Sequence, residues 1–352
     1  MRIVVAMSGG VDSSVAAALL AREGHDVVGL SMQLYDQQQG EITFGSCCTL
    51  DDLYDARRVA ASIGIPHYIV NFERKFEEHV VSDFVREYAA GRTPIPCVHC
   101  NGDLKFASLV ERAEAFEAEA VATGHYAQVD LDEETRRYRL KRGVDPQKDQ
   151  SYFLFTLTQA QLARARFPVG ALDKPAVREE ARRLGLRVAE KKDSQEICFV
   201  AAGEHAGFVG KRAQIPGGVI QDREGHVLGR HEGVHRFTIG QRKGLGLSAG
   251  VPLYVVGIDA DTASVTVGSR EDLERTELTA SRVNWMSGDV PAAPIRARAQ
   301  IRYRHREALA TITPTGSDSV SVVFDEPQTA ITPGQAVVFY DRDVVLGGGW
   351  IA

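Results

Sequence analysis

The sequence has no long hydrophobic run, few aromatic residues and only five cysteines. No stretch approaches the roughly 18 apolar residues of a membrane span, and the N-terminal apolar run is too short for a signal peptide. An odd number of cysteines in a chain of 352 residues argues against a secreted disulfide framework and favours metal or redox chemistry at some of the thiols. We therefore expect a cytoplasmic protein without a membrane partner.

The chain also has only a small excess of charge of one sign. The formal net charge is −6, with 44% hydrophobic and 25% charged residues, which is typical of a globular protein. Residues 1–205 carry 25 basic and 31 acidic side chains, whereas residues 206–352 carry 16 of each. A balance of this kind disfavours a general affinity for nucleic acid, so any surface that binds nucleic acid must be local.

The first 205 residues alternate between strand and helix patterns. Short β-rich runs of the buried kind occur at 3–7, 27–32, 67–72 and 120–124, and helical patterns occur at 13–22, 50–63, 75–90 and 104–119. Two further helices are expected at 158–163 and 175–184, the second begun by Pro175. This alternation predicts an α/β domain over 1–205, built on a doubly wound parallel sheet.

The pattern changes near residue 206. Glycines become frequent, helical patterns become scarce, and short alternating runs occur at 252–258 and 264–268. Beyond residue 276 the chain reads as all-β, with runs at 295–303, 319–324 and 336–340. We predict a small linker domain over 206–275 and a compact β-barrel over 276–352.

The segment 8–13, Ser-Gly-Gly-Val-Asp-Ser, joins the first predicted strand to the first helix. Gly9 and Gly10 lack the Cβ that would block a ligand, so backbone N–H groups can converge on an anion at the helix start. The loop has no lysine of the Walker type, and its glycine spacing is not that of a dinucleotide-binding loop. A plain tight turn would also use two glycines, but the polar side chains around this one favour a phosphate site at the strand end.

Three cysteines are candidates for thiol chemistry. Cys97 and Cys100 come just before a helix expected from about Asp103, where the positive end of the helix dipole lowers a thiol pKa and suits a nucleophile. Their spacing also fits a redox pair, half of a metal site or two inert buried thiols. Cys198 stands between Ile197 and Phe199, as a core cysteine would, although the segment before it is polar and basic.

Two more cysteines and one glycine have weaker signals. Cys47 and Cys48 are adjacent, a spacing that strains a mutual disulfide, so we leave them unassigned between burial and a secondary redox role. Gly124 ends the fourth predicted strand and so borders the same crevice as the segment 8–13. It either lets a nucleotide approach the backbone or serves a turn alone.

A row of arginines suggests an anionic partner. Alternate positions of a strand share a face, so five arginines and Gln300 are expected on one side of it: Arg296, Arg298, Arg302, Arg304 and Arg306. Like charges in a row repel, and a phosphate backbone would relieve that repulsion. A merely solvated face is the alternative. The segment 240–246 adds a second basic, glycine-rich loop with the same plausible target.

Taken together, these segments resemble the tRNA-specific 2-thiouridylases, a family of PP-loop ATP pyrophosphatases. The resemblance spans essentially the whole chain, and its motifs are AMSGGVDS (6–13), GRTPIPCVHCN (91–101), ATGHY (122–126), KDQSYFL (148–154), KKDSQEICF (191–199), TIGQRKGLG (238–246) and the final LGGGW. The family replaces O2 of the wobble uridine, position 34 of certain tRNAs, by sulfur. The resemblance therefore implies a transferase that uses ATP and Mg²⁺ and releases AMP and pyrophosphate.

The resemblance also implies roles for individual residues. It implies a nucleophile at Cys100 and a persulfide carrier at Cys198, which end each turnover as a disulfide that must be reduced. It implies an ATP site formed by Ala6, Met7, Ser8, Gly9, Gly10, Val11, Asp12, Ser13, Met32 and Gly124, with Asp12 a candidate Mg²⁺ partner, and tRNA contacts at Lys148, Asp149, Gln150, Arg302 and Tyr303. Sulfur would come from a relay protein or a cysteine desulfurase, and the enzyme is expected to act as a monomer.

One residue departs from the family pattern. Well-studied members have Asp three residues before the nucleophile, where it is thought to act as an acid or base, and this chain has Cys97 there. Cys97 either supports the redox chemistry of the other two thiols, or Cys97, Cys100 and Cys198 together hold an iron–sulfur cluster. The rival functions are a PP-loop ligase that adenylates a small-molecule carboxylate or amide, and a non-catalytic RNA-binding protein that uses ATP as a switch.

Overall fold

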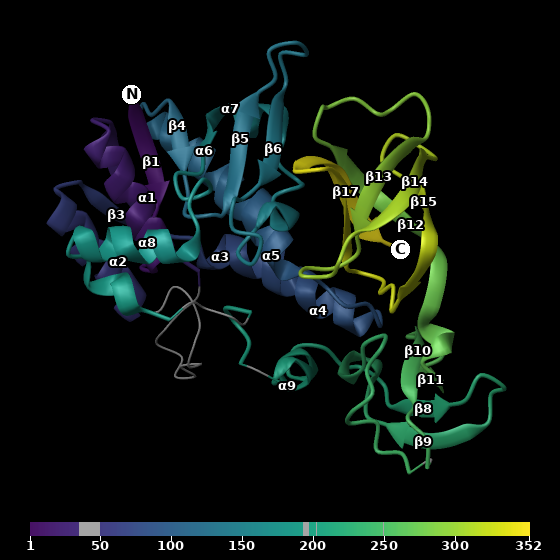
Figure 1. Ribbon diagram of the computed structural model, residues 1–352. Coiled ribbons are helices and arrows are strands. Elements are labelled where there is room, and N and C mark those ends of the chain that lie inside the picture. The colour runs from purple at the N-terminus through teal and green to yellow at the C-terminus, as the bar shows by residue number, and fades with distance from the viewer. Residues whose placement is uncertain (35–49, 193–196, 202, 249) are drawn as a thin grey trace.

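The computed structural model describes residues 1–34, 50–192, 197–201, 203–248 and 250–352 (Figure 1). Cys47 and Cys48 lie outside the described residues. The N-terminal domain contains a five-stranded sheet in the order β3-β2-β1-β4-β7, and every neighbouring pair is parallel. Its strands are β1 (Arg2–Ala6), β2 (Asp26–Gln33), β3 (His67–Asn71), β4 (Ala120–Ala122) and β7 (Ala165–Arg166).

Helices cover both faces of this sheet, so the predicted doubly wound architecture is confirmed. Ile3 and Val5 of β1 pack in one apolar cluster with residues of α1 (Val11–Arg22), α2 (Leu50–Ile63) and α8 (Lys174–Arg183). Val4 faces the opposite side, into a second cluster with residues of α6 (Ala107–Ala115) and the segments before it. Successive side chains of β1 thus pack into two different apolar cores, one on each face of the sheet.

One predicted strand is more exposed than its sequence indicates. The run 67–72 reads as a buried strand, but β3 is the edge of the sheet, and the side chains of Tyr68 and Ile69 are 48% and 46% exposed. The apolar run therefore reflects an edge strand rather than a central one. Apolar composition alone does not distinguish the two.

Two of the predicted helices contain π-helical segments. The pattern at 75–90 corresponds to α3 (Glu73–Phe76), the π-helical η2 (Glu77–Val81) and α4 (Ser82–Ala89). The pattern at 104–119 begins earlier than expected, with α5 (Pro96–His99) leading into the π-helical η3 (Cys100–Phe106) and then α6. We call residues 96–115 the thiol helix. Because η2 and η3 contact each other, the two widened turns lie side by side.

The remaining elements of the N-terminal domain lead toward the other domains. A hairpin of β5 (Ala127–Leu131) and β6 (Tyr138–Arg142) is followed by η4 (Ser151–Phe153), α7 (Gln159–Arg164), η5 (Arg187–Glu190) and α9 (His205–Gly210). Strand β6 pairs with the last strand of the chain at Lys141 and Val344. The hairpin thus continues the sheet of the C-terminal domain, beside which it lies in Figure 1.

The central and C-terminal domains are both built on β-sheets, as predicted. The central sheet has the order β10-β11-β8-β9, with β8 (Gly218–Gln221), β9 (Val227–His231), β10 (Tyr254–Asp259) and β11 (Ser264–Gly268); short 3₁₀ turns η6 (Val234–Arg236) and η7 (Glu271–Leu273) lie near it in sequence. The C-terminal sheet closes into a six-stranded barrel because β12 pairs with both β15 and β17. Its strands are β12 (Glu274–Trp285), β13 (Ile295–Gln300), β14 (Ala308–Pro314), β15 (Val320–Thr329), β16 (Ala336–Asp341) and β17 (Val344–Ile351).

The barrel shares a core with the N-terminal domain. Val338, Tyr340 and Val345 of the barrel lie in the same buried cluster as Phe155 and Leu104 of the N-terminal domain. Gly348 of β17 allows this contact, because a Cβ there would come within 2.8 Å of the Phe155 ring. By contrast, the central domain extends away from the sheet in Figure 1 and has a small cluster of its own.

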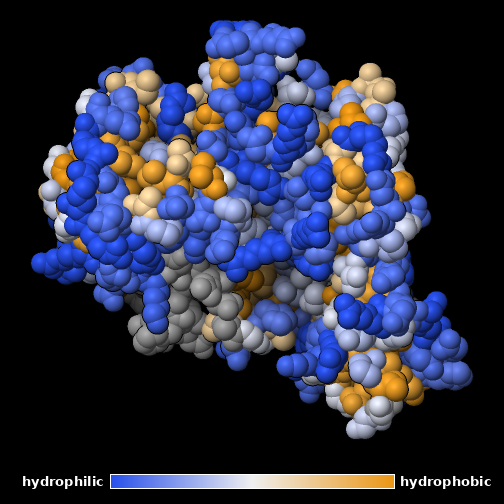
Figure 2. All heavy atoms as spheres, viewed as in Figure 1, coloured by the Kyte–Doolittle hydropathy of each residue, from blue (hydrophilic) through white to orange (hydrophobic). Residues whose placement is uncertain are grey.

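The surface is mostly polar on the face shown in Figure 2, with apolar patches over the N-terminal domain and over the central domain. Exposed apolar residues of the central domain include Val227 and Leu228. Within the described ranges, no helix is both long enough and apolar enough to cross a membrane.

Candidate active site

The segment 8–13, which we call the glycine loop, is closed by its own side chains. The Ser8 N–H donates to Ser13 Oγ at 3.2 Å, and Ser14 Oγ donates to the Gly10 carbonyl at 2.8 Å. Gly9 has a φ of +75°, and a Cβ there would overlap the carbonyl oxygen of Asp52 in α2. The loop therefore needs glycine at position 9 for its conformation and for its approach to α2.

Gly124 is brought directly against the glycine loop. A Cβ on Gly124 would lie 2.5 Å from the Ser13 backbone nitrogen, so the end of β4 can meet the first turn of α1 only without a side chain. The structure thus unites two sites that the sequence places about a hundred residues apart, at the carboxyl ends of neighbouring parallel strands. The contact of Gly124 is with the protein backbone at the helix start.

Asp12 accepts hydrogen bonds from two residues that lie outside the glycine loop. Lys174 Nζ donates to both carboxylate oxygens, at 2.8 and 2.9 Å, and the Tyr126 hydroxyl donates to one of them at 2.7 Å. Lys174 is the first residue of α8 and is 8% exposed. A lysine absent from the glycine loop itself thus reaches it from a distant helix. Nothing in the sequence around position 174 indicates this role.

A magnesium ion would compete with Lys174 for Asp12. Carboxylate oxygens suit Mg²⁺, but in the parts of the chain that the structure describes no three His, Cys, Asp or Glu side chains are grouped to hold a metal ion. The donor set therefore fits a single carboxylate contact that requires Lys174 to move, with the remaining ligands supplied by water and substrate phosphates.

The strands beneath the glycine loop hold the other residues of the predicted ATP site. Ala6 ends β1, Met7 follows it and is buried, and the Met7 carbonyl accepts a 2.6 Å hydrogen bond from Ser31 Oγ. Met32 of β2 is also buried, and it belongs to the same apolar cluster as Cys100. That cluster reaches from the strands beneath the glycine loop to the thiol helix.

His125, next to Gly124, is a neutral histidine. Burial, with a smaller contribution from the positive charge of Lys105, lowers its pKa to about 3. Its Nδ1 lies 2.8 Å from Thr123 Oγ1, and its ring meets the rings of Phe106 and Phe167. His125 therefore packs η3 against the end of β4 without contributing charge.

Cys100 does not lie at the positive end of a helix dipole, contrary to the prediction. The thiol helix begins at Pro96, so Cys100 is its fifth residue and not a residue ahead of its N-terminus. Cys97 occupies the first turn and is exposed, whereas Cys100 is buried, 7% exposed, at the start of the π-helical segment. The dipole thus acts on the thiol at Cys97. The sequence predicts a helix from about Asp103, but Pro96 starts the helix at its own position.

The barrel holds the thiol helix in place. The His99 ring stacks on the Trp350 ring with centroids 5.2 Å apart, and His99 Nε2 lies 3.4 Å from Asp83 Oδ2. Just before the helix, the Thr93 N–H donates to the Pro333 carbonyl at 2.8 Å and Gln335 Nε2 donates to the Thr93 carbonyl at 3.0 Å. The position of Cys100 therefore depends on contacts with the C-terminal barrel.

The central domain touches the same segment. A Cβ on Gly91 would come within 2.6 Å of the Ile258 side chain, and Thr93 Oγ1 lies 3.4 Å from Thr238 Oγ1. All three domains thus meet at residues 91–93, directly before the thiol helix. The glycine at position 91 is explained by this close approach and by its φ of +72°.

Cys198 reaches the same apolar cluster as Cys100. It is partly buried and packs against that cluster, as does Phe199. The Phe199 ring meets Phe76 and Phe84 edge-on, at 5.4 and 5.2 Å. Two thiols that are 98 residues apart in sequence thus belong to, or pack against, the same apolar cluster. Cys97, Cys100 and Cys198 do not form a metal-binding group in this conformation.

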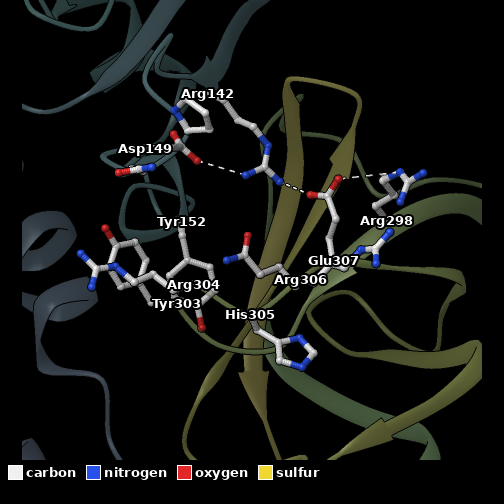
Figure 3. Close-up of a pocket in the computed structure, with 12 residues that line it drawn as sticks. Arg142, Asp149, Tyr152, Arg298, Tyr303, Arg304, His305, Arg306 and Glu307 are labelled. Carbon is white, nitrogen blue, oxygen red and sulfur yellow. Dashed lines mark hydrogen bonds and ion pairs between the residues drawn. The ribbon is translucent and has the colours of Figure 1, made fainter. Parts of the chain in front are cut away.

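A polar cavity of about 490 Å³ lies between the N-terminal domain and the barrel (Figure 3). Among the expected tRNA contacts, Asp149 and Tyr303 line it, while Lys148, Gln150 and Arg302 are not in its wall. The wall consists of Arg142, Pro146, Gln147, Asp149, Tyr152, Arg298, Gln300, Tyr303, Arg304, His305, Arg306 and Glu307. Its cationic side chains outnumber its carboxylates.

The predicted row of arginines on one strand is wrong in its geometry. Strand β13 ends at Gln300, which is buried, so the arginines beyond it lie in the turn that leads to β14. Arg296 is paired with Asp325 at 2.6 Å, and Arg302 donates to the carbonyls of Thr329 and Ala330. The chain itself thus supplies partners for part of the row, while Arg298 on β13 and Arg304 and Arg306 in the turn line the cavity.

Arg142 bridges two carboxylates of the cavity wall (Figure 3). Its guanidinium donates to Asp149 Oδ2 at 3.1 Å and to Glu307, and it lies 3.7 Å from the centroid of the Tyr340 ring. Glu307 also lies 3.7 Å from Arg298. An incoming phosphate would compete with these two carboxylates for the arginines.

Three family models match consecutive parts of the chain. The tRNA methyl transferase HUP domain matches residues 1–202, the tRNA methyl transferase PRC-barrel domain residues 206–269 and the Aminomethyltransferase beta-barrel domain residues 275–351. Two relatives cover 99% of this chain and 98% of their own length. They are the tRNA-specific 2-thiouridylases MnmA of Solibacter usitatus (strain Ellin6076), 56% identical to this chain, and of Koribacter versatilis (strain Ellin345), 51% identical. The chain belongs to the tRNA-specific 2-thiouridylase family.

Other members agree with this assignment. The tRNA-specific 2-thiouridylase MnmA of Geotalea uraniireducens (strain Rf4) is 53% identical over 99% of this chain and 94% of its own length. A 4-thiouridine synthetase in complex with RNA and ATP is 15% identical, covers 56% of this chain and 44% of its own, and has a TM-score of 0.36, an overlap too small to bear on function. Membership of the 2-thiouridylase family confirms the resemblance drawn from the seven motifs.

Proposed function

We propose that the protein is a tRNA-uridine 2-sulfurtransferase, which replaces O2 of uridine 34 by sulfur at the expense of ATP. The observation that carries this proposal is that Cys100 belongs to, and Cys198 packs against, one apolar cluster that also contains Met32 of the predicted ATP site. An adenylating ligase would need the loop but no such pair of thiols. An RNA-binding switch would need neither thiol.

The reaction begins with adenylation. O2 of the uridine attacks the α-phosphorus of ATP and pyrophosphate leaves, which converts a very poor leaving group into AMP. The glycine loop offers the backbone N–H groups at the start of α1 to the phosphates, and Mg²⁺ would add charge compensation there through Asp12. We assign the ATP site to residues 6–13 with Met32 and Gly124.

Sulfur transfer follows at the thiols. A persulfide on Cys198, loaded by a relay protein or a cysteine desulfurase, attacks C2 and AMP departs. Cys100 then attacks the sulfur atom of Cys198, which breaks the S–S bond and leaves the outer sulfur on the uridine. The products are 2-thiouridine and a Cys100–Cys198 disulfide, which a two-electron reductant returns to thiols. If the persulfide is reduced first, Cys100 forms the same disulfide and hydrosulfide attacks C2.

We assign tRNA binding to the cavity between the domains, with Asp149 and Tyr303 in its wall and Lys148, Gln150 and Arg302 beside it. The cationic side chains of the wall suit a phosphate backbone. We further propose the domain limits 1–205, 206–275 and 276–352, a monomer and a cytoplasmic location.

The test is nucleoside mass spectrometry of tRNA incubated with ATP, a persulfide donor and the wild-type, Cys100→Ser or Cys198→Ser protein. We expect 2-thiouridine from the wild type and none from either variant. Thiolation that persists in both variants would overturn the roles of the thiols. Pyrophosphate release that requires no tRNA would favour a ligase.

Cys97 requires a separate test, because redox support and an iron–sulfur cluster predict different iron contents for the active purified protein. Protein purified without oxygen is assayed for iron, sulfide and thiolation, with Cys97→Ser as the comparison. Full activity without iron would exclude the cluster. Activity proportional to iron content, lost in Cys97→Ser together with the iron, would exclude simple redox support.

A further inference from the structure

Tyr152 joins the wall of the cavity to the strands of the barrel. Its ring and that of Tyr303 lie side by side in the wall, with centroids 6.2 Å apart (Figure 3). The Tyr152 hydroxyl donates a 2.8 Å hydrogen bond to the carbonyl of Ala336, the first residue of β16. Tyr152 is only 1% exposed, so this hydrogen bond is shielded from water. Burial raises the pKa of Tyr152 well above its usual value, and the hydroxyl therefore remains a donor at neutral pH.

Ala336 connects this hydrogen bond to Trp350. The two residues are opposite each other in the antiparallel pairing of β16 with β17. Beside them, the Ile351 N–H donates to the Gln335 carbonyl at 2.8 Å, which ties the same ends of the two strands together. The carbonyl that Tyr152 holds thus belongs to the strand partner of Trp350.

Phe155 gives the same segment a second contact with Trp350. It follows Tyr152 by three residues, and the centroid of its buried ring lies 5.2 Å from that of the Trp350 ring. Gly348 of β17 leaves the room that this ring needs. Residues 152–155 therefore line the cavity at their start and contact Trp350 in two ways, through β16 and directly.

Trp350 in turn contacts the residue next to the proposed nucleophile. Its ring stacks on that of His99, with centroids 5.2 Å and planes 25° apart, and His99 immediately precedes Cys100. The cavity and the thiol helix are thus linked by a continuous series of contacts between buried or half-buried groups. Because a close-packed interior is hardly compressible, a displacement at one end of such a series is transmitted to the other.

We propose that Tyr152 is a positioning residue that couples RNA in the cavity to the position of Cys100. A nucleotide that packs against Tyr303 displaces the neighbouring Tyr152 ring. The hydroxyl passes that displacement to β16 and β17, and through Trp350 to the thiol helix. The nucleophile is therefore placed for reaction when RNA is bound. The proposal rests on the proposed function, in which the cavity binds tRNA and Cys100 is the nucleophile.

The first test follows the fluorescence of Trp350 during titration with an unmodified transcript of a tRNA that has uridine at position 34. The chain has two tryptophans, so Trp285→Phe leaves Trp350 as the single emitter. We expect the transcript to change the emission of this protein, and we expect that change to be lost when Tyr152→Phe is added. Tyr152→Phe keeps the ring in the cavity wall, so the transcript should still bind, which filter binding measures.

The second test follows Cys100 itself. Its alkylation by iodoacetamide is measured by mass spectrometry of the peptide, with fragment ions that distinguish it from Cys97. We expect the transcript to change the wild-type rate about fivefold or more, and the rate of Tyr152→Phe less than about twofold. In Tyr152→Phe the kcat for thiolation should fall about fivefold with no rise in the KM for tRNA, a split that a defect in RNA binding would not produce.

Tyr138→Phe is the matched control, because Tyr138 is another tyrosine that packs against the apolar cluster of Tyr152. It should keep both responses to RNA and the wild-type kcat. Phe155→Leu keeps the hydrogen bond to Ala336 but shortens the second contact, and should weaken both responses, so the test stands even if Tyr152→Phe does not fold. A folded Tyr152→Phe protein that binds the transcript and keeps both responses would overturn the proposal, as would an equal loss in Tyr138→Phe.

Failure of this coupling is distinguishable from failure of the proposed function. If the wild type thiolates tRNA but neither Trp350 nor Cys100 responds to RNA, the coupling is wrong and the function stands. If both respond to RNA through Tyr152 but no 2-thiouridine forms, the function is wrong and the coupling stands.

Discussion

The glycine loop and the thiol helix differ in how their geometry is maintained. The loop is closed by hydrogen bonds between residues at most five positions apart, such as the one from the Ser8 N–H to Ser13 Oγ. The thiol helix instead depends on Trp350 and Gln335, which are more than 230 residues away. Local contacts can thus close the loop of the proposed ATP site, whereas the placement of Cys100, the proposed nucleophile, requires the completed barrel.

The largest expected effect comes from breaking the loop at Gly9. Gly9→Ala introduces a Cβ at a φ of +75° and against the Asp52 carbonyl, so we expect tRNA-dependent pyrophosphate release to fall more than about 100-fold and the free energy of unfolding by about 3 kcal/mol. Pyrophosphate release and urea unfolding measure the two effects.

Gly24→Ala is the control for that change. Gly24 has a φ of +83°, but a Cβ there would meet no atom within 4 Å. The substitution should therefore cost about 1 kcal/mol from backbone strain and leave activity intact. Equal losses in the two variants would show that strain, and not the approach to α2, explains Gly9.

The second-largest expected effect comes from breaking the contact between the barrel and the thiol helix. Trp350→Ala removes the ring that stacks on His99, so we expect a loss of about 2 kcal/mol in unfolding free energy and a fall in kcat for thiolation, with the Kd for ATP unchanged. Trp350→Phe keeps a ring at this position and should recover most of kcat. A rise in the Kd for ATP equal to the fall in kcat would contradict the separation of the two regions.

The third effect is a pH dependence. The pKa of His125 is lowered to about 3 by burial, so below its unfolded value of about 6.5 the unfolded chain binds a proton that the folded one does not. Stability should therefore fall with decreasing pH between about 6.5 and 3, with His125 contributing up to about 1.4 kcal/mol per pH unit. Urea unfolding of His125→Gln should show a shallower slope over this range, and an unchanged slope would exclude His125 as its source.

The smallest effect separates two arginines of one strand. Arg298 lines the cavity, whereas Arg296, two residues earlier on β13, is paired with Asp325. We expect Arg298→Ala to weaken tRNA binding about threefold and reduce its salt dependence, and Arg296→Ala to change neither. Filter binding at several salt concentrations measures both, and the KM for ATP should stay constant. Equal losses would place the RNA on the strand face and not in the cavity.

The same contrast explains how much the sequence could predict. The strand alternation, the glycine loop and the three-domain order depend on local patterns, and the structure agrees with them. The position of Cys100 within a helix, the partners of the arginines, and the contact of Lys174 with Asp12 depend on contacts between distant segments. Periodicity carries no information about such contacts, so these features were missed or misplaced.

The shared core of the N-terminal domain and the barrel has a consequence for synthesis of the chain. Strand β17 (Val344–Ile351) supplies Val345 to the core around Leu104 and accommodates Phe155 through Gly348. A ribosome releases the sheet of the N-terminal domain long before these residues emerge. The nascent chain therefore carries the glycine loop for most of translation before Cys100 is held in place, and the proposed sulfur transfer would become possible only as its last strand is added.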